Sequence, residues 1–187
     1  MANSKIFLIG GGEISERETE AIDRETLASR KKTGTIVFIG AAAGDSEGYY
    51  ECFKKYYSSL CNDKDFVMLK STTSVKEAKK TLLDASLVYL GGGKTETLYD
   101  TLQNWGGKEL LEEVSKAGVI LAGISAGAYV LAKEWRHFED GEVKTGPGFG
   151  LANVVIECHS TINSRKIIAE QTDKNFISLK NCEFYSC

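Results

Sequence analysis

The fold is decided by the stretch VILAGISAGA, which occupies residues 119–128. Its first half is apolar and rich in branched side chains, which is typical of a buried strand. Its second half is small enough to begin a helix after a tight turn. Ser125 stands at the junction, between Gly123 and Gly127. The stretch matches the strand–turn–helix pattern G-x-S-x-G, so it predicts an α/β fold with Ser125 raised above the end of a sheet.

The rest of the chain repeats this alternation of short apolar runs and longer helical patterns. Strands are predicted at 5–9, 35–39, 66–69, 86–90, 119–122, 153–158 and 176–179. Helices are predicted at 14–32, 49–60, 74–83, 95–103, 108–116, 126–134 and 164–173. Because strands that alternate with helices pair in parallel, we expect one α/β domain over residues 1–187, a three-layer sandwich with a mostly parallel sheet.

Composition narrows the class of protein. Charged residues make up 26% of the 187 residues, the formal net charge is −3, and no long block of lysine or arginine occurs. This argues against nucleic acids and anionic membranes as partners. No apolar run approaches the ~20 residues that span a bilayer, and the N-terminus lacks the pattern of a signal peptide. The five cysteines form no C-x-x-C pair. We therefore expect a cytoplasmic protein with reduced thiols and no zinc site.

The position of Ser125 suits a nucleophile. The serine begins the predicted helix, where the backbone N–H of Ala126 is free and the helix dipole favours negative charge. Both effects stabilise an attacking oxygen and the oxyanion that it creates, so Ala126 is a candidate donor of an oxyanion hole. The alternative is a turn rich in glycine and alanine, in which Ser125 is only a helix cap.

A second glycine loop, LGGGKT at residues 90–95, also joins a strand to a helix. It is not a phosphate-binding P-loop, because that pattern needs a glycine where Val88 stands. We interpret it as a backbone platform facing the site. Gly93 is a candidate for the second oxyanion donor, and Gly92 and Lys94 are candidate substrate-binding residues. The alternative is a tight turn without a ligand.

A serine nucleophile needs a base, and the chain has only two histidines. His159 follows a predicted strand at the carboxyl edge of the sheet, where Ser125 also lies. His137 follows a helix and stands among charged residues, which is typical of a solvated side chain. We therefore predict His159 as the base. The candidates for the group that orients the histidine are Asp140, Asn181 and Glu183, with Glu157 and Asp173 as weaker choices.

These segments together resemble the aspartyl dipeptidase (peptidase E) and cyanophycinase family of serine peptidases. The likeness covers most of the chain and rests on YLGGGKT at 89–95, GISAGA at 123–128 and a strand that ends at His159. The resemblance implies a glutamine-amidotransferase-like α/β sandwich in which serine replaces the cysteine of those amidotransferases. It also implies that Ser125 is the nucleophile, that His159 is the base, and that Gly93 and Ala126 form the oxyanion hole.

The chain departs from the family at three places. Family members carry the triad acid either after the serine helix, where Asp140 stands, or after the last strand, where this chain has Asn181. Asp140 is the expected acid, with Asn181 or Glu183 as alternatives. The family's asparagine after the triple glycine is Lys94 here. The family also continues with further strands, which suggests a chain shortened at its C-terminus.

The expected function is that of a serine peptidase that hydrolyses short peptides through an acyl-enzyme on Ser125. The resemblance implies a dipeptidase with a preference for Asp, and we expect no metal or cofactor and a monomer or homodimer. The alternatives are a cyanophycinase-like peptidase and a weak or inactive member that acts as a binding protein. An ordinary α/β-hydrolase is disfavoured, because only about 30 residues separate Ser125 from His159, too few for its intervening elements.

Overall fold

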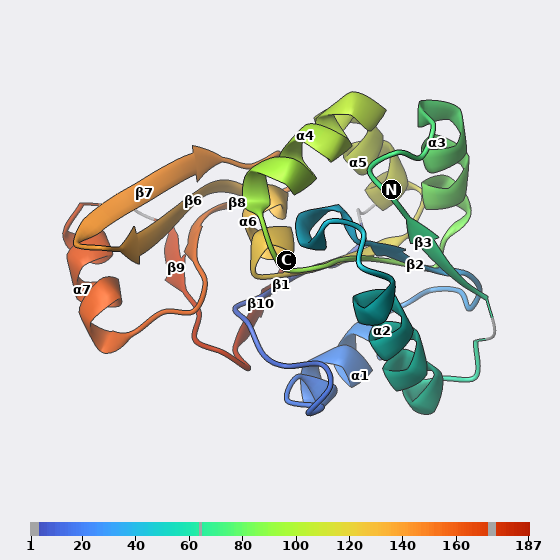
Figure 1. The fold of residues 1–187 in the computed structure, drawn as a ribbon, viewed down its shortest axis with the longest axis horizontal. Coiled ribbons are helices and arrows are strands. Elements are labelled where there is room, and N and C mark those ends of the chain that lie inside the picture. Colours follow the sequence, from blue (N-terminus) through green and yellow to red (C-terminus); the bar gives the residue numbers. More distant parts are fainter. Residues whose placement is uncertain (1–3, 64, 172–174) are drawn as a thin grey trace.

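The computed structural model describes residues 4–63, 65–171 and 175–187, which are arranged around two β-sheets (Figure 1). The strands of the larger sheet are β1 (Ile6–Ile9), β2 (Ile36–Ile39), β3 (Phe66–Leu69), β4 (Leu87–Leu90), β5 (Ile120–Ile124) and β10 (Phe184–Ser186). They lie in the order β10-β1-β5-β4-β2-β3, and every pair is parallel except β10 with β1. The predicted α/β fold with a mostly parallel sheet is therefore confirmed.

The smaller sheet extends the molecule on one side. Its strands are β6 (Ala132–Glu139), β7 (Glu142–Pro147), β8 (Ala152–Glu157) and β9 (Phe176–Ser178). They lie in the order β7-β6-β8-β9, with only β6 and β7 antiparallel. The strand β8 ends just before His159, so this sheet carries the predicted base toward the edge of the larger sheet.

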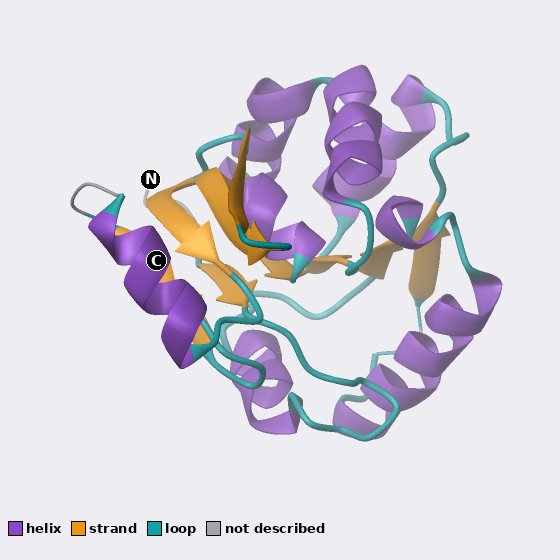
Figure 2. Cartoon of the chain, turned by 60° about the vertical axis from the view of Figure 1, so that its left-hand side comes forward, coloured by secondary structure: helices purple, strands orange, loops and turns teal. Residues whose placement is uncertain are grey.

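Helices cover both faces of the larger sheet (Figures 1 and 2). The helices α1 (Glu20–Ala28) and α2 (Glu47–Leu60) lie on one face. The other face is covered by α3 (Val75–Asp84), α4 (Thr95–Trp105), α5 (Gly107–Lys116) and α6 (Ala126–Leu131), and α7 (Ile162–Glu170) packs beside β6. Along β1, Phe7 and Ile9 enter the core under α1 and α2, whereas Ile6 and Leu8 enter the opposite core. Burial on both faces explains why the inner strands β1 and β2 are apolar at every position.

The hairpin of β6 and β7 is the main difference from the predicted elements. The helix expected at 126–134 ends at Leu131, and the chain then continues directly into β6. Asp140 and Gly141 connect the two strands, with φ angles of 52° and 85°. Two consecutive positive φ angles are typical of the type I′ turn that an Asp-Gly pair favours. This pair is therefore the sequence signal for a hairpin in place of a loop.

The first helix and the last strand also differ from expectation. Turns occupy residues 14–19 of the segment predicted as one long helix, and α1 begins only at Glu20. The strand β10 was not predicted, and it joins the sheet edge by antiparallel pairing and by stacking of Phe184 on Phe7, with ring centroids 5.9 Å apart. No helix within the described ranges is long and apolar enough to cross a bilayer.

A buried carboxylate joins α1 to α2. The Asp23 side chain is 0% exposed. It accepts hydrogen bonds from the hydroxyls of Thr19 at 2.7 Å, Tyr56 at 2.9 Å and Tyr57 at 2.6 Å. Burial raises the pKa of Asp23, and the three hydrogen bonds offset part of that rise. The neighbouring hydroxyl of Tyr89 is buried without a hydrogen-bond partner among the described residues. We call Thr19, Asp23, Tyr56 and Tyr57 the Asp23 cluster.

Candidate active site

Ser125 stands on a strained turn between β5 and α6. Its backbone has φ 53° and ψ −110°, and its N–H donates to the carbonyl oxygen of Ile9 at 2.9 Å. A Cβ atom on Gly123 would lie 2.3 Å from the carbonyl of Gly127, and one on Gly127 would lie 2.2 Å from the carbonyl oxygen of Leu90. Neither glycine position has room for a side chain, because backbone atoms approach each other closely there. This tight packing holds Ser125 in a backbone conformation that residues with a side chain rarely adopt.

His159 reaches Ser125 from the end of β8. The distance between His159 Nε2 and Ser125 Oγ is 2.8 Å. The histidine has a positive φ of 54°, and its N–H donates to the carbonyl oxygen of Gly10 at 2.9 Å. The hydroxyl of Tyr129, on α6, accepts the N–H of Cys158 at 3.1 Å. The serine helix and the histidine strand are thus joined directly, and the structure brings together the two residues that the sequence predicts as nucleophile and base.

The second nitrogen of the imidazole meets an amide. His159 Nδ1 lies 2.8 Å from Asn181 Oδ1. When the amide oxygen accepts the Nδ1 proton, Nε2 is left to accept the proton of Ser125 Oγ. The loop that carries Asn181 is fixed by a hydrogen bond from Cys182 N–H to the carbonyl oxygen of Gly11 at 2.9 Å. The three side chains form one hydrogen-bonded row, which we call the triad row.

Gly11 contributes to the site through its lack of a side chain. A Cβ atom there would lie 2.4 Å from both Asn181 Oδ1 and His159 Cε1. The loop after β1 therefore presses directly on the imidazole and the amide. The sequence analysis assigned residues 10–12 no part in the site. The signal is the run of three glycines after a strand, which marks close backbone approach.

The structure does not bring Asp140 to His159. Asp140 lies at the tip of the β6–β7 hairpin, and both ring nitrogens of His159 face other side chains, those of Ser125 and Asn181. An Asp-Gly turn explains this residue without a catalytic role. The sequence analysis placed Asp140 in a loop after the serine helix, whereas the hairpin places it at the far end of β6.

The other candidates for the orienting group have different partners. The carboxylate of Glu183 accepts the N–H of Lys180 at 2.9 Å, and that of Glu157 accepts the hydroxyl of Ser178 at 2.7 Å. Asp173 lies outside the described residues. His137 lies on β6 and is half-buried, with Nδ1 3.4 Å from the hydroxyl of Tyr129. The sequence analysis predicted that His137 follows a helix and is solvated. That prediction is wrong, because His137 lies on a strand and is half-buried.

The second glycine loop lies beside Ser125. A Cβ atom on Gly92 would lie 3.5 Å from Ser125 Cβ. Gly93 has φ 136° and its Cα faces the carbonyl oxygen of Ala42 so closely that no side chain fits. Within the described ranges, the N–H groups of Gly93 and Ala126 have no acceptor. Lys94 directly precedes α4, and its side chain is exposed. One donor lies on the glycine loop and the other at the start of α6, and two unpaired donors beside Ser125 are what an oxyanion hole requires.

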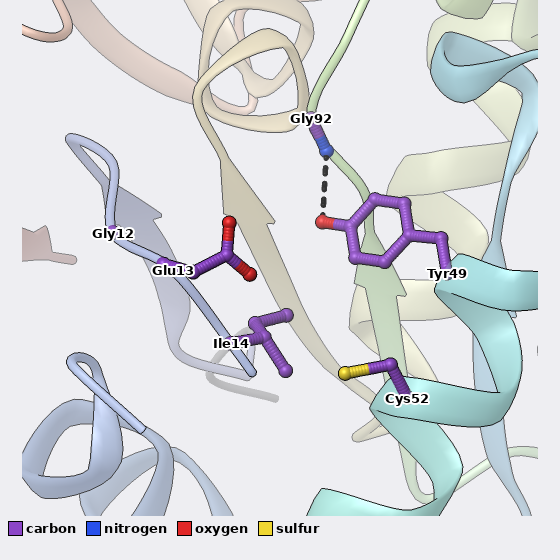
Figure 3. Close-up of a pocket in the computed structure, with 6 residues that line it drawn as sticks. All are labelled: Gly12, Glu13, Ile14, Tyr49, Cys52 and Gly92. Carbon is purple, nitrogen blue, oxygen red and sulfur yellow. Dashed lines mark hydrogen bonds between the residues drawn. The ribbon is translucent and has the colours of Figure 1, made fainter. Parts of the chain in front are cut away.

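A cavity of about 380 Å³ adjoins this loop (Figure 3). The residues that line it are Gly12, Glu13, Ile14, Tyr49, Cys52 and Gly92. The Gly92 N–H donates to the Tyr49 hydroxyl at 3.4 Å. Burial raises the pKa of Tyr49 to about 12, and the negative charge of Glu13 adds to the rise, so this hydroxyl is neutral at pH 7. Sequence reasoning missed Glu13 and Tyr49, because nothing local connects the loop after β1 to the start of α2.

No cluster of metal-binding side chains lies within the part of the chain that the structure describes. The functional groups that do converge are a serine, a histidine and an amide, on an elbow with free backbone donors beside it. This is the constellation that serine hydrolases use, in which the imidazole takes the proton of the attacking hydroxyl.

Comparison with known proteins gives the family. The sequence profile of peptidase family S51 matches residues 6–182, and the chain belongs to this family. Its relatives include the uncharacterized peptidase YgaJ of Bacillus subtilis (strain 168), which is 32% identical over 127 residues. The match covers 66% of this chain and 54% of YgaJ, so the chain spans about half the length of that curated relative.

Two solved structures share the fold. The crystal structure of a peptidase from an acI-B1 Actinobacterium superposes with a TM-score of 0.64 at 23% identity, covering 99% of this chain and 83% of that one. A putative peptidase E protein from Listeria monocytogenes EGD-e superposes with a TM-score of 0.72 at 20% identity, covering 100% and 95%. At these identities the likeness establishes the α/β fold alone.

Proposed function

We propose that the chain is a serine peptidase that hydrolyses short peptides through an acyl-enzyme on Ser125. The observation that carries the proposal is the 2.8 Å distance between His159 Nε2 and Ser125 Oγ on a strained elbow. Membership of peptidase family S51 supports the same chemistry. A hydroxyl is a weak nucleophile by itself, and a base within hydrogen-bond distance is what activates it.

The reaction follows from the positions of the groups. Ser125 Oγ attacks the peptide carbonyl carbon while His159 Nε2 takes the hydroxyl proton. The N–H groups of Gly93 and Ala126 stabilise the oxyanion of the tetrahedral intermediate, and the imidazolium then protonates the leaving amine. Water attacks the acyl-enzyme by the same route and releases the acid. Gly92, which packs on Ser125, and Lys94 flank the path of the substrate.

Asn181 is the orienting group in this proposal, in the role first expected of Asp140. Its amide oxygen holds the imidazole in the tautomer that leaves Nε2 free. An amide carries no charge, so it stabilises the imidazolium less than a carboxylate does. We therefore expect the chain to turn over its substrate slowly.

The proposed substrate is a peptide of a few residues. The cavity beside Gly92 has a volume of about 380 Å³, which suits one or two amino-acid residues. The preference for Asp and the cyanophycinase alternative rest on the family resemblance. An acidic acyl side chain would need a cation such as Lys94, because the cavity itself is lined by Glu13. A dipeptide panel therefore includes Asp as one N-terminal residue among neutral and basic ones.

The test is hydrolysis of that panel by the parent chain and by three variants. Ser125→Ala and His159→Ala should each abolish turnover of the best substrate, because one removes the nucleophile and the other the base. His137→Ala is the matched control, and we expect near-parental kcat because the hydrogen-bond partner of His137 is Tyr129, and not a member of the triad row. Near-parental turnover by Ser125→Ala would overturn the proposal, as would loss of activity in His137→Ala with retention in His159→Ala.

A further inference from the structure

The cavity beside the elbow has an acidic wall. Glu13 is the one charged side chain among its six lining residues. Figure 3 shows the Glu13 carboxylate on the side of the loop that faces Tyr49 and Gly92. The other walls are apolar or neutral, from Ile14, Cys52 and the Tyr49 ring. A carboxylate in such a setting gives the cavity a negative electrostatic potential.

Glu13 is held in place without being neutralised. Its Oε1 accepts the N–H of Ser15 at 3.1 Å and the hydroxyl of Ser15 at 2.9 Å. Both hydrogen bonds lower the pKa of Glu13, and the one from the backbone N–H of Ser15 has the larger effect. The carboxylate is therefore charged at neutral pH. Within the described ranges, Oε2 accepts no hydrogen bond and no lysine or arginine pairs with Glu13. The charge is therefore available to a ligand.

The cavity is placed where a bound substrate would extend from Ser125. Gly92 lines it and packs on Ser125 Cβ. On the opposite wall, Gly12 follows directly after Gly11, which contacts the imidazole of His159. Both loops that form the cavity therefore touch the triad row, and a group bound between them lies next to the reacting carbonyl.

The lining matches a cationic group on a short apolar stem. The carboxylate of Glu13 and the neutral hydroxyl of Tyr49 are acceptors for an N–H donor, and Ile14 offers an apolar surface for methylene groups. A hydrogen bond between ammonium and carboxylate is among the stronger polar contacts in proteins. An acidic group in the same place would face the unpaired charge of Glu13 and be repelled.

We propose that this cavity binds a positively charged nitrogen group of the substrate, with Glu13 as its counter-ion and specificity-determining residue. The proposal rests on the proposed peptidase function and names its substrate class. Two sources supply the same chemistry, the free α-amino group of a peptide and the side chain of lysine or arginine.

Calorimetric binding to the Ser125→Ala protein tests the proposal without requiring turnover. The peptides are Ala-Ala, N-acetyl-Ala-Ala, N-acetyl-Lys-Ala, N-acetyl-norleucyl-Ala and N-acetyl-Asp-Ala. Comparison of Ala-Ala with N-acetyl-Ala-Ala isolates the effect of the α-amino group. Comparison of N-acetyl-Lys-Ala with N-acetyl-norleucyl-Ala isolates the effect of the lysine ammonium. We expect at least one cationic peptide to bind about tenfold more tightly than its neutral partner, the factor that a charge-assisted hydrogen bond supplies.

Two further variants in the same background assign the effect. Glu13→Gln should reduce the preference to less than twofold, since the amide keeps an oxygen for Ser15 but loses the charge. Glu16→Gln is the matched control, because Glu16 is exposed on the same loop and does not line the cavity, and it should keep the preference. Melting temperatures equal to that of Ser125→Ala show that all variants are folded.

The contrary outcomes are distinct from failure of the peptidase proposal. Equal binding of cationic and neutral peptides, no detectable binding of any peptide, tightest binding of N-acetyl-Asp-Ala, or a preference that survives Glu13→Gln would each overturn the cation site. Absence of hydrolysis by the parent chain would overturn the peptidase function alone. A cation preference that depends on Glu13 would stand even then, because it is measured without catalysis.

Discussion

The Asp23 cluster and the triad row are two hydrogen-bonded polar groups in one molecule, and they differ in burial. Asp23 is 0% exposed and receives three hydroxyl donors. In the triad row, His159 and Asn181 are exposed, and Ser125 and His159 both have positive φ angles. A buried, satisfied network contributes stability, whereas backbone strain at Ser125 and His159 costs it. Similar hydrogen bonds thus stabilise the fold in one place and, in the proposed mechanism, prepare a reaction in the other.

This difference predicts that mutations in the two regions change different properties, activity in one and stability in the other. Changes in the triad row should lower activity and leave the free energy of unfolding unchanged or higher. Changes in the Asp23 cluster should lower the free energy of unfolding and leave the activity of the folded molecules unchanged. Variants of Ser125, Asp23, Asn181 and Tyr57 test whether activity and stability separate in this way.

The largest expected effect is on catalysis at Ser125. Ser125→Ala should lower kcat by a factor of about 10⁴ or more, because the residue that forms the acyl-enzyme is gone. Ser125→Gly should be equally inactive and more stable by about 1 kcal/mol, since glycine adopts the positive φ of 53° without strain. Kinetic assays and urea denaturation measure the two effects. A glycine variant less stable than the parent would show that the elbow is not strained.

The next effect is on stability at Asp23. Asp23→Ala leaves three buried hydroxyls without their acceptor, so we expect the free energy of unfolding to fall by about 3 kcal/mol. Urea denaturation measures this loss, with Asp100→Ala, an exposed acid on α4, as the matched control. Activity per folded molecule should be unchanged. A loss below about 0.5 kcal/mol would contradict a stabilising role for the cluster.

The pH dependence of stability has a definite sign at Asp23. Burial raises the pKa of this carboxyl in the folded chain above its usual value of 3.8. The folded state therefore holds the proton more tightly than the unfolded state between those two pKa values. The free energy of unfolding of the parent, measured relative to Asp23→Asn, should fall as pH rises through this window. A relative stability that rises with pH there would show that the hydrogen bonds outweigh the burial.

An intermediate effect is expected at the group that orients the base. Asn181→Ala should lower kcat about a hundredfold with a smaller change in KM, because the imidazole loses the partner of Nδ1. Asp140→Ala should change kcat less than twofold, since Asp140 lies at a hairpin tip. Reversed effects at positions 181 and 140 would restore Asp140 as the orienting acid.

The smallest expected effect is a difference in the free energy of unfolding between variants of two buried tyrosines, Tyr57 and Tyr89. Tyr57→Phe removes a hydroxyl that donates to Asp23 at 2.6 Å, and we expect a loss of about 1–2 kcal/mol in the free energy of unfolding. Tyr89→Phe removes a buried hydroxyl without a partner among the described residues, so its effect should be near zero or stabilising. Equal losses in the two variants would show that the hydrogen bond to Asp23 contributes nothing.

The sequence predicts the elements whose signal is local. The elbow follows from small residues between an apolar strand and a helix, and both glycines of the motif sit where the backbone leaves no room for a side chain. The parallel core strands follow from continuous apolar runs. The hairpin at Asp140 was missed although its Asp-Gly signal is local, because the helical pattern was extended past Leu131.

The parts of the site that sequence reasoning could not assign depend on tertiary contacts. Asn181 meets His159 only because the loop after β9 is tied to Gly11 in the loop after β1. No spacing within 176–183 distinguishes Asn181 from Glu183 as the partner of Nδ1. The cavity also depends on tertiary contacts, because Glu13 and Tyr49 come from segments more than 30 positions apart in the sequence.

The central claim, that His159 activates Ser125, is tested most directly by covalent trapping. The parent chain, Ser125→Ala and His159→Ala are incubated with a fluorophosphonate probe, and the adducts are located by peptide mass spectrometry. We predict an adduct on Ser125 in the parent, none at that position in Ser125→Ala, and labelling at least about a hundredfold slower in His159→Ala. An unlabelled Ser125 in the parent, or equal labelling rates with and without the histidine, would contradict the account.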